Sequence, residues 1–337
     1  MSNIIADLRK ELGLTQTELA LACGLTRPLI SAVETDRHTP SVKAALAIAR
    51  ALGTSVEELF GAKPPQEEQR PALGAPPEDE TSVMAVKVGE ALSYHPIANA
   101  GSGWERADGV LRDGRVELFD DADTSGFAVA GCDPALGLAA SLLPSRGPQR
   151  LVAIQAPTAA ALKALDESTI HAALVHGPRG HLKKSSRPVR RFILADWQVG
   201  LAVRAGTSTE MEKLAKGKLR AVWRDPGAEA QRALERRLVA AGGVILKQGP
   251  VASGHLDAAR HVAYGSADVA ATMEAAALAY GLDFSPLETH TVELRVAEEW
   301  EAHPGARALL DLIASKALLS RLEALGGYDL RRAGNAA

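Results

Sequence analysis

Residues 14–41 read LTQTELALACGLTRPLISAVETDRHTPS, and this stretch decides the fold of the first part of the chain. Thr15 and the glutamate three residues later have the spacing of a capping box, which predicts a helix that begins after Thr15 and runs to about Cys23. Gly24 then ends this helix, and Thr26 is placed to cap a second one. The stretch therefore predicts two short helices joined by a tight turn, a helix-turn-helix.

Apolar residues around this stretch recur at helical spacing up to about residue 61. We expect them to build one small helical core, made of Leu19, Ala20, Leu25, Ile30, Val33, Leu46, Ile48, Ala49, Leu52, Val56, Leu59 and Phe60. The first 63 residues are thus predicted to form an all-α head.

The motifs LTQTELA and GLTRPLISAVETDRHTPS resemble the pattern of phage-repressor-like regulators of the Xre family, over about residues 4–61. The resemblance implies that the second helix enters the major groove, with Arg27 reading a guanine, and that a homodimer binds a palindromic double-stranded operator. It implies that Gln16, Arg37 and Ser41 lie along the phosphate backbone. The full set of expected DNA-binding residues is Gln16, Thr26, Arg27, Pro28, Ser31, Ala32, Arg37 and Ser41.

Residues 64–82 contain five prolines and five acidic residues against one arginine. Such a composition buries little apolar surface and disfavours both helix and sheet, so we expect an extended acidic linker here. Residues 83–118 then show short apolar runs broken by turn signals, which predict a small β segment.

From Phe127 onward, short apolar strands alternate with helices, as in FAVAG followed by DPALGLAASLL. This alternation predicts parallel sheets with ligand sites at the carboxyl ends of the strands. The pattern restarts after WQVGLAVRAG, so we expect two sheets and two lobes within residues 119–337. The first lobe is predicted to take about 119–197 and 284–337, and the second about 198–283. The fold class is therefore multidomain, an all-α head followed by a two-lobed α/β domain.

The blocks VAGCDPALGLAASLL, QVGLAVRAG and HVAYGSADVAATMEAAALAYGLDFSPL resemble the substrate-binding domain of periplasmic binding proteins. The form fused to a repressor-like head is described as molybdate-binding-like. The resemblance implies a type II fold in which the chain crosses between lobes near 195–205 and 283–297. It also implies that a ligand binds between the lobes and closes them.

The strand-to-helix corners supply the candidate ligand-binding residues, which are Cys132, Asp133, Thr158, His176, Arg224, Asp225, Gly227, Ser253, His255, Thr272 and Glu274. Asp133 and Asp225 each open a helix, where a carboxylate would repel an oxyanion such as molybdate or tungstate. Arg224, with the hydroxyls of Thr158 and Ser253, would instead favour an anion. A polar organic molecule or cation and an oxyanion thus both remain open.

The composition and the cysteine and histidine spacing limit which functions and locations the sequence supports. The net charge of -3 gives no overall basic field, so DNA contact must come from a local surface. Cys23 and Cys132 lie far apart, which predicts a reduced cytoplasmic compartment, and no run of about 18 apolar residues predicts a membrane span. The histidine spacing fits no zinc pattern, so neither metal nor cofactor is predicted. Cys132 could be a redox sensor or an inert core residue.

The sequence contains no GxSxG, P-loop or GxGxxG motif, which disfavours an enzyme. We therefore expect a ligand-responsive one-component transcription regulator that senses a small molecule or an oxyanion. The alternatives are a sensor specific for molybdate or tungstate, and a DNA-binding regulator that responds to redox state or to no ligand.

Overall fold

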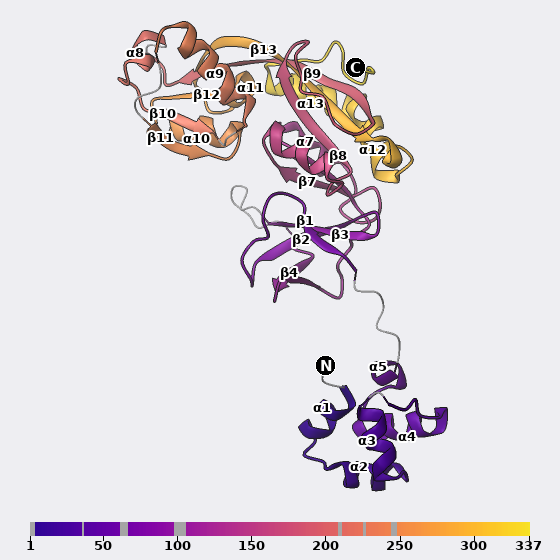
Figure 1. Cartoon of the computed structure of the whole chain (residues 1–337). Helices are drawn as coiled ribbons and strands as arrows, with labels where there is room; N and C mark the ends of the chain where they lie inside the picture. Colours follow the sequence, from indigo (N-terminus) through magenta and orange to yellow (C-terminus); the bar gives the residue numbers. More distant parts are fainter. Residues whose placement is uncertain are drawn as a thin grey trace. The chain divides into compact units, whose positions relative to one another are not determined.

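The computed structural model describes residues 4–35, 37–60, 67–97, 106–207, 211–224, 227–243 and 248–337. The chain divides into two compact units, Met1–Glu67 and Glu68–Ala337. The first unit is helical, and the second combines a small sheet with a large α/β domain (Figure 1).

The first unit contains the helix-turn-helix that the sequence predicts. Its helices are α1 (Ile4–Glu11), α2 (Gln16–Cys23), α3 (Arg27–Glu34), α4 (Val42–Leu52) and α5 (Val56–Phe60). Thr15 forms the full capping box with Glu18, and Gly24 ends α2 with a φ of 64°, a left-handed conformation that glycine adopts without strain. Thr26 stands at the N-cap of α3 but makes no side-chain capping bond, unlike the prediction.

The core of this unit packs α1 to α5 around Leu19, Ile30 and Ile48. Leu46 was expected in that core but is 44% exposed, because α4 turns its side chain away from the buried face that carries Ala45 and Ile48. A buried ion pair adds to the packing: Arg9 Nε lies 2.6 Å from Glu34 Oε1 at the end of α3.

The second unit begins with a five-stranded sheet in the order β1-β3-β2-β4-β5. Its strands are β1 (Gln69–Pro71), β2 (Ser82–Val88), β3 (Ala91–Pro96), β4 (Gly109–Arg112) and β5 (Arg115–Leu118). β1 lies inside the predicted linker and pairs in parallel with β3, and the following Ala72 is buried. The linker prediction therefore extended too far, because backbone pairing and one buried apolar residue outweigh the unfavourable composition.

The large α/β domain takes the rest of the chain. Its strands are β6 (Phe127–Gly131), β7 (Leu151–Gln155), β8 (Ala172–Pro178), β9 (Val189–Val203), β10 (Ala221–Arg224), β11 (Gln248–Ala252), β12 (Val269–Met273), β13 (Asp283–Ala297) and β14 (Tyr328–Asp329). Its helices are α6 (Ala135–Leu142), α7 (Thr158–Asp166), α8 (Met211–Ala215), α9 (Glu229–Ala240), α10 (His255–Ala263), α11 (Glu274–Ala279), η1 (Glu298–Trp300), α12 (Pro304–Ile313) and α13 (Lys316–Leu325).

These strands form one nine-stranded sheet, not the two that the sequence predicts. The order is β11-β10-β12-β9-β13-β8-β6-β7, with β14 paired to β9. The parallel set β6, β7 and β8 and the parallel set β10, β11 and β12 are joined by β9 and β13, which run antiparallel to each other over 15 residues each (Figure 1). The two expected lobe crossings fall on these long strands, so hydrogen bonding continues from one lobe into the other.

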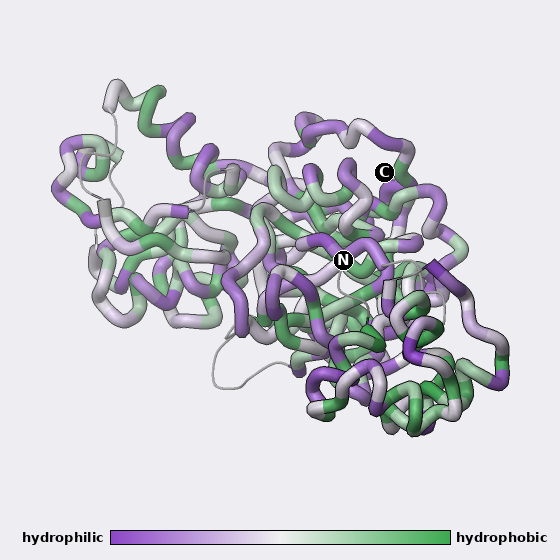
Figure 2. Tube along the Cα trace, turned by 60° about the horizontal axis from the view of Figure 1, so that its bottom comes forward, coloured by the Kyte–Doolittle hydropathy of each residue, from purple (hydrophilic) through white to green (hydrophobic). Residues whose placement is uncertain are grey.

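The small sheet packs onto the first lobe. Met84 and Val86 of β2 share a buried cluster with Ile154 of β7 and Leu165 of α7. Hydrophobic and hydrophilic residues alternate in short blocks along the chain (Figure 2). Among the described residues, no helix is long and apolar enough to cross a membrane.

Candidate functional site

The outward face of α3 is the candidate DNA-binding surface of the first unit. One face of α3 is buried in the core and carries Ile30, Val33 and Glu34. Thr26, Arg27 and Pro28 are exposed and Ser31 and Ala32 are half-buried on the opposite side of the helix. Of the remaining expected contacts, Arg37 and Ser41 are exposed.

Gln16 has a second role that the sequence did not suggest. Its Nε2 donates to Glu34 Oε2 at 2.8 Å, so the start of α2 is tied to the end of α3. Burial raises the pKa of Glu34, but the hydrogen bonds from Arg9 and Gln16 outweigh burial and hold the pKa below its usual value. Ser41 likewise caps α4 by accepting from the Ala44 N–H at 3.3 Å.

A cavity of about 470 Å³ is the main candidate site of the second unit. Its wall combines the corner between β6 and α6, the end of β7 and the corner between β11 and α10, and the small sheet contributes Met84 and His95. Across it, Gln155 Nε2 of β7 donates to the Ser253 carbonyl at 3.1 Å. Burial lowers the pKa of His95 to about 4, so this ring is neutral at neutral pH.

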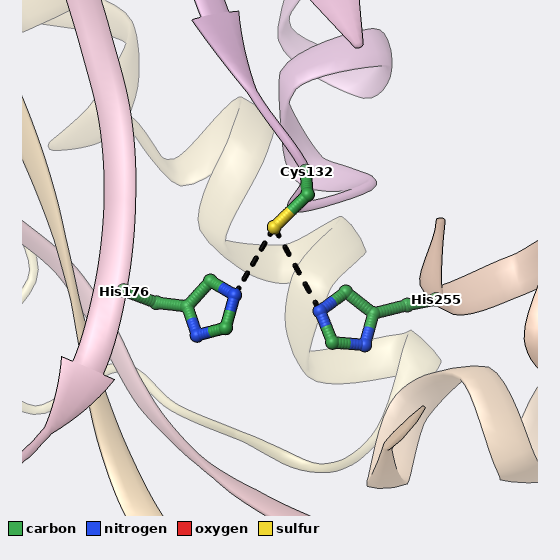
Figure 3. A group of neighbouring side chains, drawn as sticks. All are labelled: Cys132, His176 and His255. Atoms are coloured by element: carbon green, nitrogen blue, oxygen red, sulfur yellow. Dashed lines mark hydrogen bonds between the residues drawn. The ribbon is translucent and has the colours of Figure 1, made fainter. Parts of the chain in front are cut away.

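Three buried side chains meet at one side of this cavity. Cys132 Sγ lies 3.0 Å from His176 Nε2 and 3.9 Å from His255 Nε2, and Figure 3 shows both rings turned toward the sulfur. Cys132 and His255 also line the cavity. Burial raises the pKa of Cys132 to about 12, and it lowers the pKa values of His176 and His255 well below the usual range. All three groups are therefore neutral at neutral pH.

Polar partners surround this cluster. His176 Nδ1 lies 2.9 Å from His290 Nδ1, and His290 Nε2 lies 2.7 Å from Glu288 Oε1, which Arg236 also contacts. On the other side, His255 Nδ1 lies 3.3 Å from Thr272 Oγ1 and 3.5 Å from Arg224 Nη1.

Thr158 and Thr272 hydrogen-bond to the backbone of His176 and His255, respectively. Thr158 Oγ1 donates to the His176 carbonyl and accepts from the His176 N–H, both at 3.2 Å. Thr272 Oγ1 donates to the His255 carbonyl at 2.9 Å. Thr158 is the first residue of α7, after Pro157 at the N-cap, and its hydroxyl bonds to β8 instead of capping the helix.

Asp133 caps the start of α6 and has further partners. Its Oδ1 accepts from the Ala135 N–H and from the Tyr328 hydroxyl, both at 2.8 Å, and its Oδ2 accepts from Trp197 Nε1 at 2.9 Å. Pro134, between Asp133 and the first assigned residue of α6, already has helical dihedral angles. The buried carboxyl thus joins α6 to β9 and β14, and burial raises its pKa.

The fold brings most of the expected ligand residues together. Hydrogen-bond or close contacts link Cys132, Thr158, His176, Arg224, His255 and Thr272. Asp133 and Ser253 line the same cavity as Cys132 and His255. Gly227 stands close to α7, since a Cβ there would lie 2.9 Å from Ala159 Cβ. Glu274 lies against Gly327 instead, and Asp225 falls outside the described residues.

Sequence reasoning did not single out Trp197, Tyr328, Glu288 and Arg236, and it noted His290 without a role. The rings of His176, His255 and His290 lie 4.7, 5.3 and 5.5 Å from that of Trp197. No local motif marks these residues, because they reach the cluster from β9, β13, α9 and β14.

Comparisons with known proteins agree with this architecture. Residues 5–59 match the family described as "Helix-turn-helix", and residues 140–314, just over half of the chain, match "PBP superfamily domain". An HTH-type transcriptional regulator of Methanothermobacter thermautotrophicus is 51% identical over 61 residues, which cover 18% of this chain and 88% of that protein.

A phage protein and a solved structure are each similar to one part of the chain. The immunity repressor protein of Bacillus phage phi105 is 40% identical over 57 residues, covering 17% of this chain and 40% of the repressor. A phosphate ABC transporter substrate-binding protein from Clostridium perfringens aligns with a TM-score of 0.47 and 11% identity, over 60% of this chain and 98% of that one. The chain therefore belongs to the PBP superfamily, and its N-terminal Xre-type helix-turn-helix makes it a transcription regulator with a periplasmic-binding-protein-like effector-binding domain.

Proposed function

We propose that this protein is a non-enzymatic, ligand-responsive regulator whose head binds a palindromic operator as a homodimer. The observation that carries the proposal is the 470 Å³ cavity, because it is bounded by strand-to-helix corners from both halves of the sheet. In sheets of this kind, ligands bind at the carboxyl ends of the strands. A ligand there touches both lobes at once.

DNA recognition is assigned to the outward face of α3. Arg27 is exposed at its first turn, where a guanidinium reaches base edges in the major groove. Thr26, Pro28, Ser31 and Ala32 share this face, and Arg37 and Ser41 follow it toward the phosphate backbone. For Gln16, the hydrogen bond to Glu34 uses one of its two amide donors and leaves the second for a phosphate.

We assign the coupling between ligand binding and operator binding to closure of the two lobes about β9 and β13. The contact between Gln155 and Ser253 already joins the two sides of the cavity. A ligand that binds the closed form more tightly than an open form shifts the protein toward closure by that difference in affinity. The shift then changes the affinity of the dimer for its operator, in either direction.

Two alternatives are distinguished by particular contacts. Against a molybdate or tungstate sensor, the Ala135 N–H at the start of α6 already donates to Asp133 and is not free for an oxyanion. This contact favours a ligand other than a bare oxyanion. Against a redox sensor, burial raises the pKa of Cys132 to about 12, and the thiolate is the form that oxidants attack.

The test uses the full chain and an operator selected from random-sequence DNA. Operator affinity is measured by fluorescence anisotropy with molybdate, tungstate and sulfate, with the cations Zn²⁺ and Cu⁺, and with amine-bearing and polyhydroxy metabolites. Gly137 lines the cavity and has open space where a Cβ would stand, so Gly137→Trp adds a large ring at the cavity wall with no clash at its Cβ. We expect one ligand class to change operator affinity and Gly137→Trp to abolish that change.

Gly137→Ala is the matched control, because it adds only a methyl group at the same position. The variant should keep the ligand response. An operator affinity that no ligand class changes, in the wild type and in both variants, would contradict ligand sensing and favour the ligand-independent alternative.

A further inference from the structure

Cys132, His176 and His255 come from three separate segments, the end of β6, the strand β8 and the start of α10. Their donor atoms nevertheless turn to one point (Figure 3). The sulfur and the two Nε2 atoms all lie within 4.8 Å of one another, and all three residues are at least 97% buried. Such convergence needs an explanation because it uses polar groups inside an apolar core.

The separations suit a bound metal ion. With zinc bond lengths of about 2.3 Å to sulfur and about 2.05 Å to nitrogen, a tetrahedral ion holds sulfur and nitrogen about 3.6 Å apart. The two sulfur to nitrogen distances are 3.0 and 3.9 Å. An ion placed between the three atoms therefore requires shifts of less than about 1 Å in these two distances.

The hydrogen bonds around His176 leave its Nε2 free to ligate. Hydrogen bonds from Arg236 and His290 outweigh burial and hold the pKa of Glu288 below its usual value, so Glu288 is a carboxylate and only accepts. His290 Nε2 therefore carries the proton that it donates to Glu288. The contact between His176 Nδ1 and His290 Nδ1 needs one donor and one acceptor, and with the His290 proton on Nε2 the donor is His176 Nδ1–H. The remaining lone pair of His176, on Nε2, faces Cys132.

His255 is oriented in the same sense. Two groups lie near His255 Nδ1, Thr272 Oγ1 at 3.3 Å and Arg224 Nη1 at 3.5 Å. Arg224 can only donate, whereas Thr272 Oγ1 uses its proton on the His255 carbonyl and can accept, so the shorter contact is satisfied by His255 Nδ1–H. The lone pair of His255 then lies on Nε2, toward the sulfur. Metal-binding histidines commonly donate their other ring N–H to a fixed acceptor in this way, which sets the tautomer and the ring orientation.

We propose that Cys132, His176 and His255 bind a thiophilic metal ion, Zn²⁺ or Cu⁺, and that this ion is the ligand sensed at the interlobe site. The proposal rests on the proposed function, since it names the effector class of that same cavity. One thiolate and two imidazoles are the donors that both ions prefer. Cys132 and His255 line the cavity, so a fourth position opens toward it.

Charges of both signs lie near the site. Arg224 places a guanidinium 3.5 Å from His255 Nδ1, and the carboxyls of Asp133 and Glu229 act on the Cys132 thiol. The titrations with both ions decide between Zn²⁺ and Cu⁺.

Binding requires one proton to leave. The Cys132 thiol loses its S–H proton to solvent as the sulfur to metal bond forms, and the two histidines ligate as neutral rings. The metal keeps its oxidation state, so the step needs no oxidant or reductant. One proton is released for each ion bound.

The experiment uses the full chain, which is reduced and freed of metal by a chelator. It is titrated with Zn²⁺ and, in the presence of a reductant, with Cu⁺. A chromophoric competitor for each ion reports the binding. Co²⁺ in place of Zn²⁺ reports a sulfur ligand through its thiolate charge-transfer absorption. We expect one ion per chain, one proton released, and affinity loss of at least about 100-fold in Cys132→Ser and in His255→Gln. In His290→Gln we expect a loss of metal affinity of about 10- to 100-fold, which is the usual effect of replacing a residue that orients a metal ligand.

Cys23→Ser and His181→Gln are the matched controls, because Cys23 lies in the first unit and His181 is exposed. Both should bind the ion as the wild type does. Thermal unfolding of each metal-free variant separates loss of the site from loss of the fold, and the His290 variant keeps all three ligands. No binding of either ion to folded wild type, or equal binding to the Cys132 and His255 variants, would overturn the proposal.

The metal titration needs no DNA, so it is independent of the test of the proposed function. If an organic ligand changes operator affinity and neither ion binds, the metal proposal fails and the regulator stands. If an ion binds at these three residues without any change in operator affinity, the site stands and its role as the sensed effector fails.

Discussion

At the residue scale, Asp133 shows how one buried carboxyl organises the site. It accepts hydrogen bonds from Ala135, Trp197 and Tyr328, which belong to α6, β9 and β14. These three bonds offset the cost of burying the group. Because its oxygens are engaged by the protein, Asp133 is better understood as a residue that positions the cavity wall than as a ligand contact.

Arg27 carries the first prediction. Arg27→Ala should weaken binding to the selected operator by about 1 to 3 kcal/mol, because it removes a contact to one base position in each half-site. Fluorescence anisotropy against operators changed at single base pairs would show the loss confined to that position. Arg50→Ala, which removes the same charge from an exposed site on α4, is the control. Uniform loss across all operator variants would assign Arg27 to phosphate contact instead.

His171 carries the second prediction. Its Nδ1 accepts from the Ala128 N–H at 2.9 Å, and burial, aided by His303, lowers its pKa to about 3. An unfolded histidine has a pKa of about 6.5, so between these values only the unfolded chain binds the proton. The free energy of unfolding should therefore fall as the pH drops below about 6.5, by up to about 1.4 kcal/mol per pH unit from this residue.

The measurement compares urea unfolding of the wild type and His171→Asn between pH 7 and pH 5, followed by tryptophan fluorescence. All four tryptophans lie in the second unit, so the signal reports that unit. The variant should show a shallower dependence of the free energy of unfolding on pH. His181→Asn, at an exposed position, should leave the slope unchanged, and equal slopes in all three proteins would disprove the assignment.

At the element scale, β1 places the boundary between the two units earlier than the composition predicts, near Glu68. The Leu92 N–H donates to the Glu68 carbonyl at 2.7 Å, and Arg70 Nη2 donates to the Ser168 carbonyl at 2.8 Å. These bonds attach residues from Glu68 onward to the second unit. A prolyl-rich composition therefore did not prevent strand formation where a partner edge was present.

Limited proteolysis tests this boundary. A brief digestion with a protease of broad specificity should make its first cut on the N-terminal side of Gln69, because the β1 backbone is paired with β3. Mass spectrometry of the stable large fragment identifies the cut. A first cut between residues 72 and 82 would instead support the longer linker that composition predicts.

At the scale of the whole molecule, β9 and β13 make one sheet out of two sets of parallel strands. Residues from both sets, such as Phe127 and Val222, belong to one buried cluster. The closure that we propose about these strands would require bending within a continuous sheet, without unfolding of either side.

The proposed homodimer and its palindromic operator give the last prediction. A two-fold dimer places its recognition helices one helical turn apart, about 34 to 36 Å, or a multiple of that distance. Inserting about five base pairs between the half-sites turns one of them to the opposite side of the duplex and should abolish tight binding. Inserting about ten should restore part of it. Anisotropy titrations give the comparison, and a single half-site that binds as tightly as the intact operator would contradict the dimer.

The sequence by itself determined the local elements and the order of the domains. The capping box at Thr15, the turn at Gly24 and the alternation of apolar strands with helices are set by contacts within about one turn or one strand, so they are visible in the chain. The resemblance to the two families, and the strand ends that line the cavity, follow from the same local signals.

Only the tertiary structure decided which of those residues share a site. Cys132, His176, His255 and His290 are separated in sequence by 35 (255 to 290) to 158 (132 to 290) positions, and only the packing of β6, β8, α10 and β13 brings their side chains together. The same is true of Trp197 and Tyr328 at Asp133, and of the pairing that extends one sheet through both lobes. The physical reason is that these contacts depend on burial and pairing between distant segments, and such contacts leave no periodicity or spacing in the sequence.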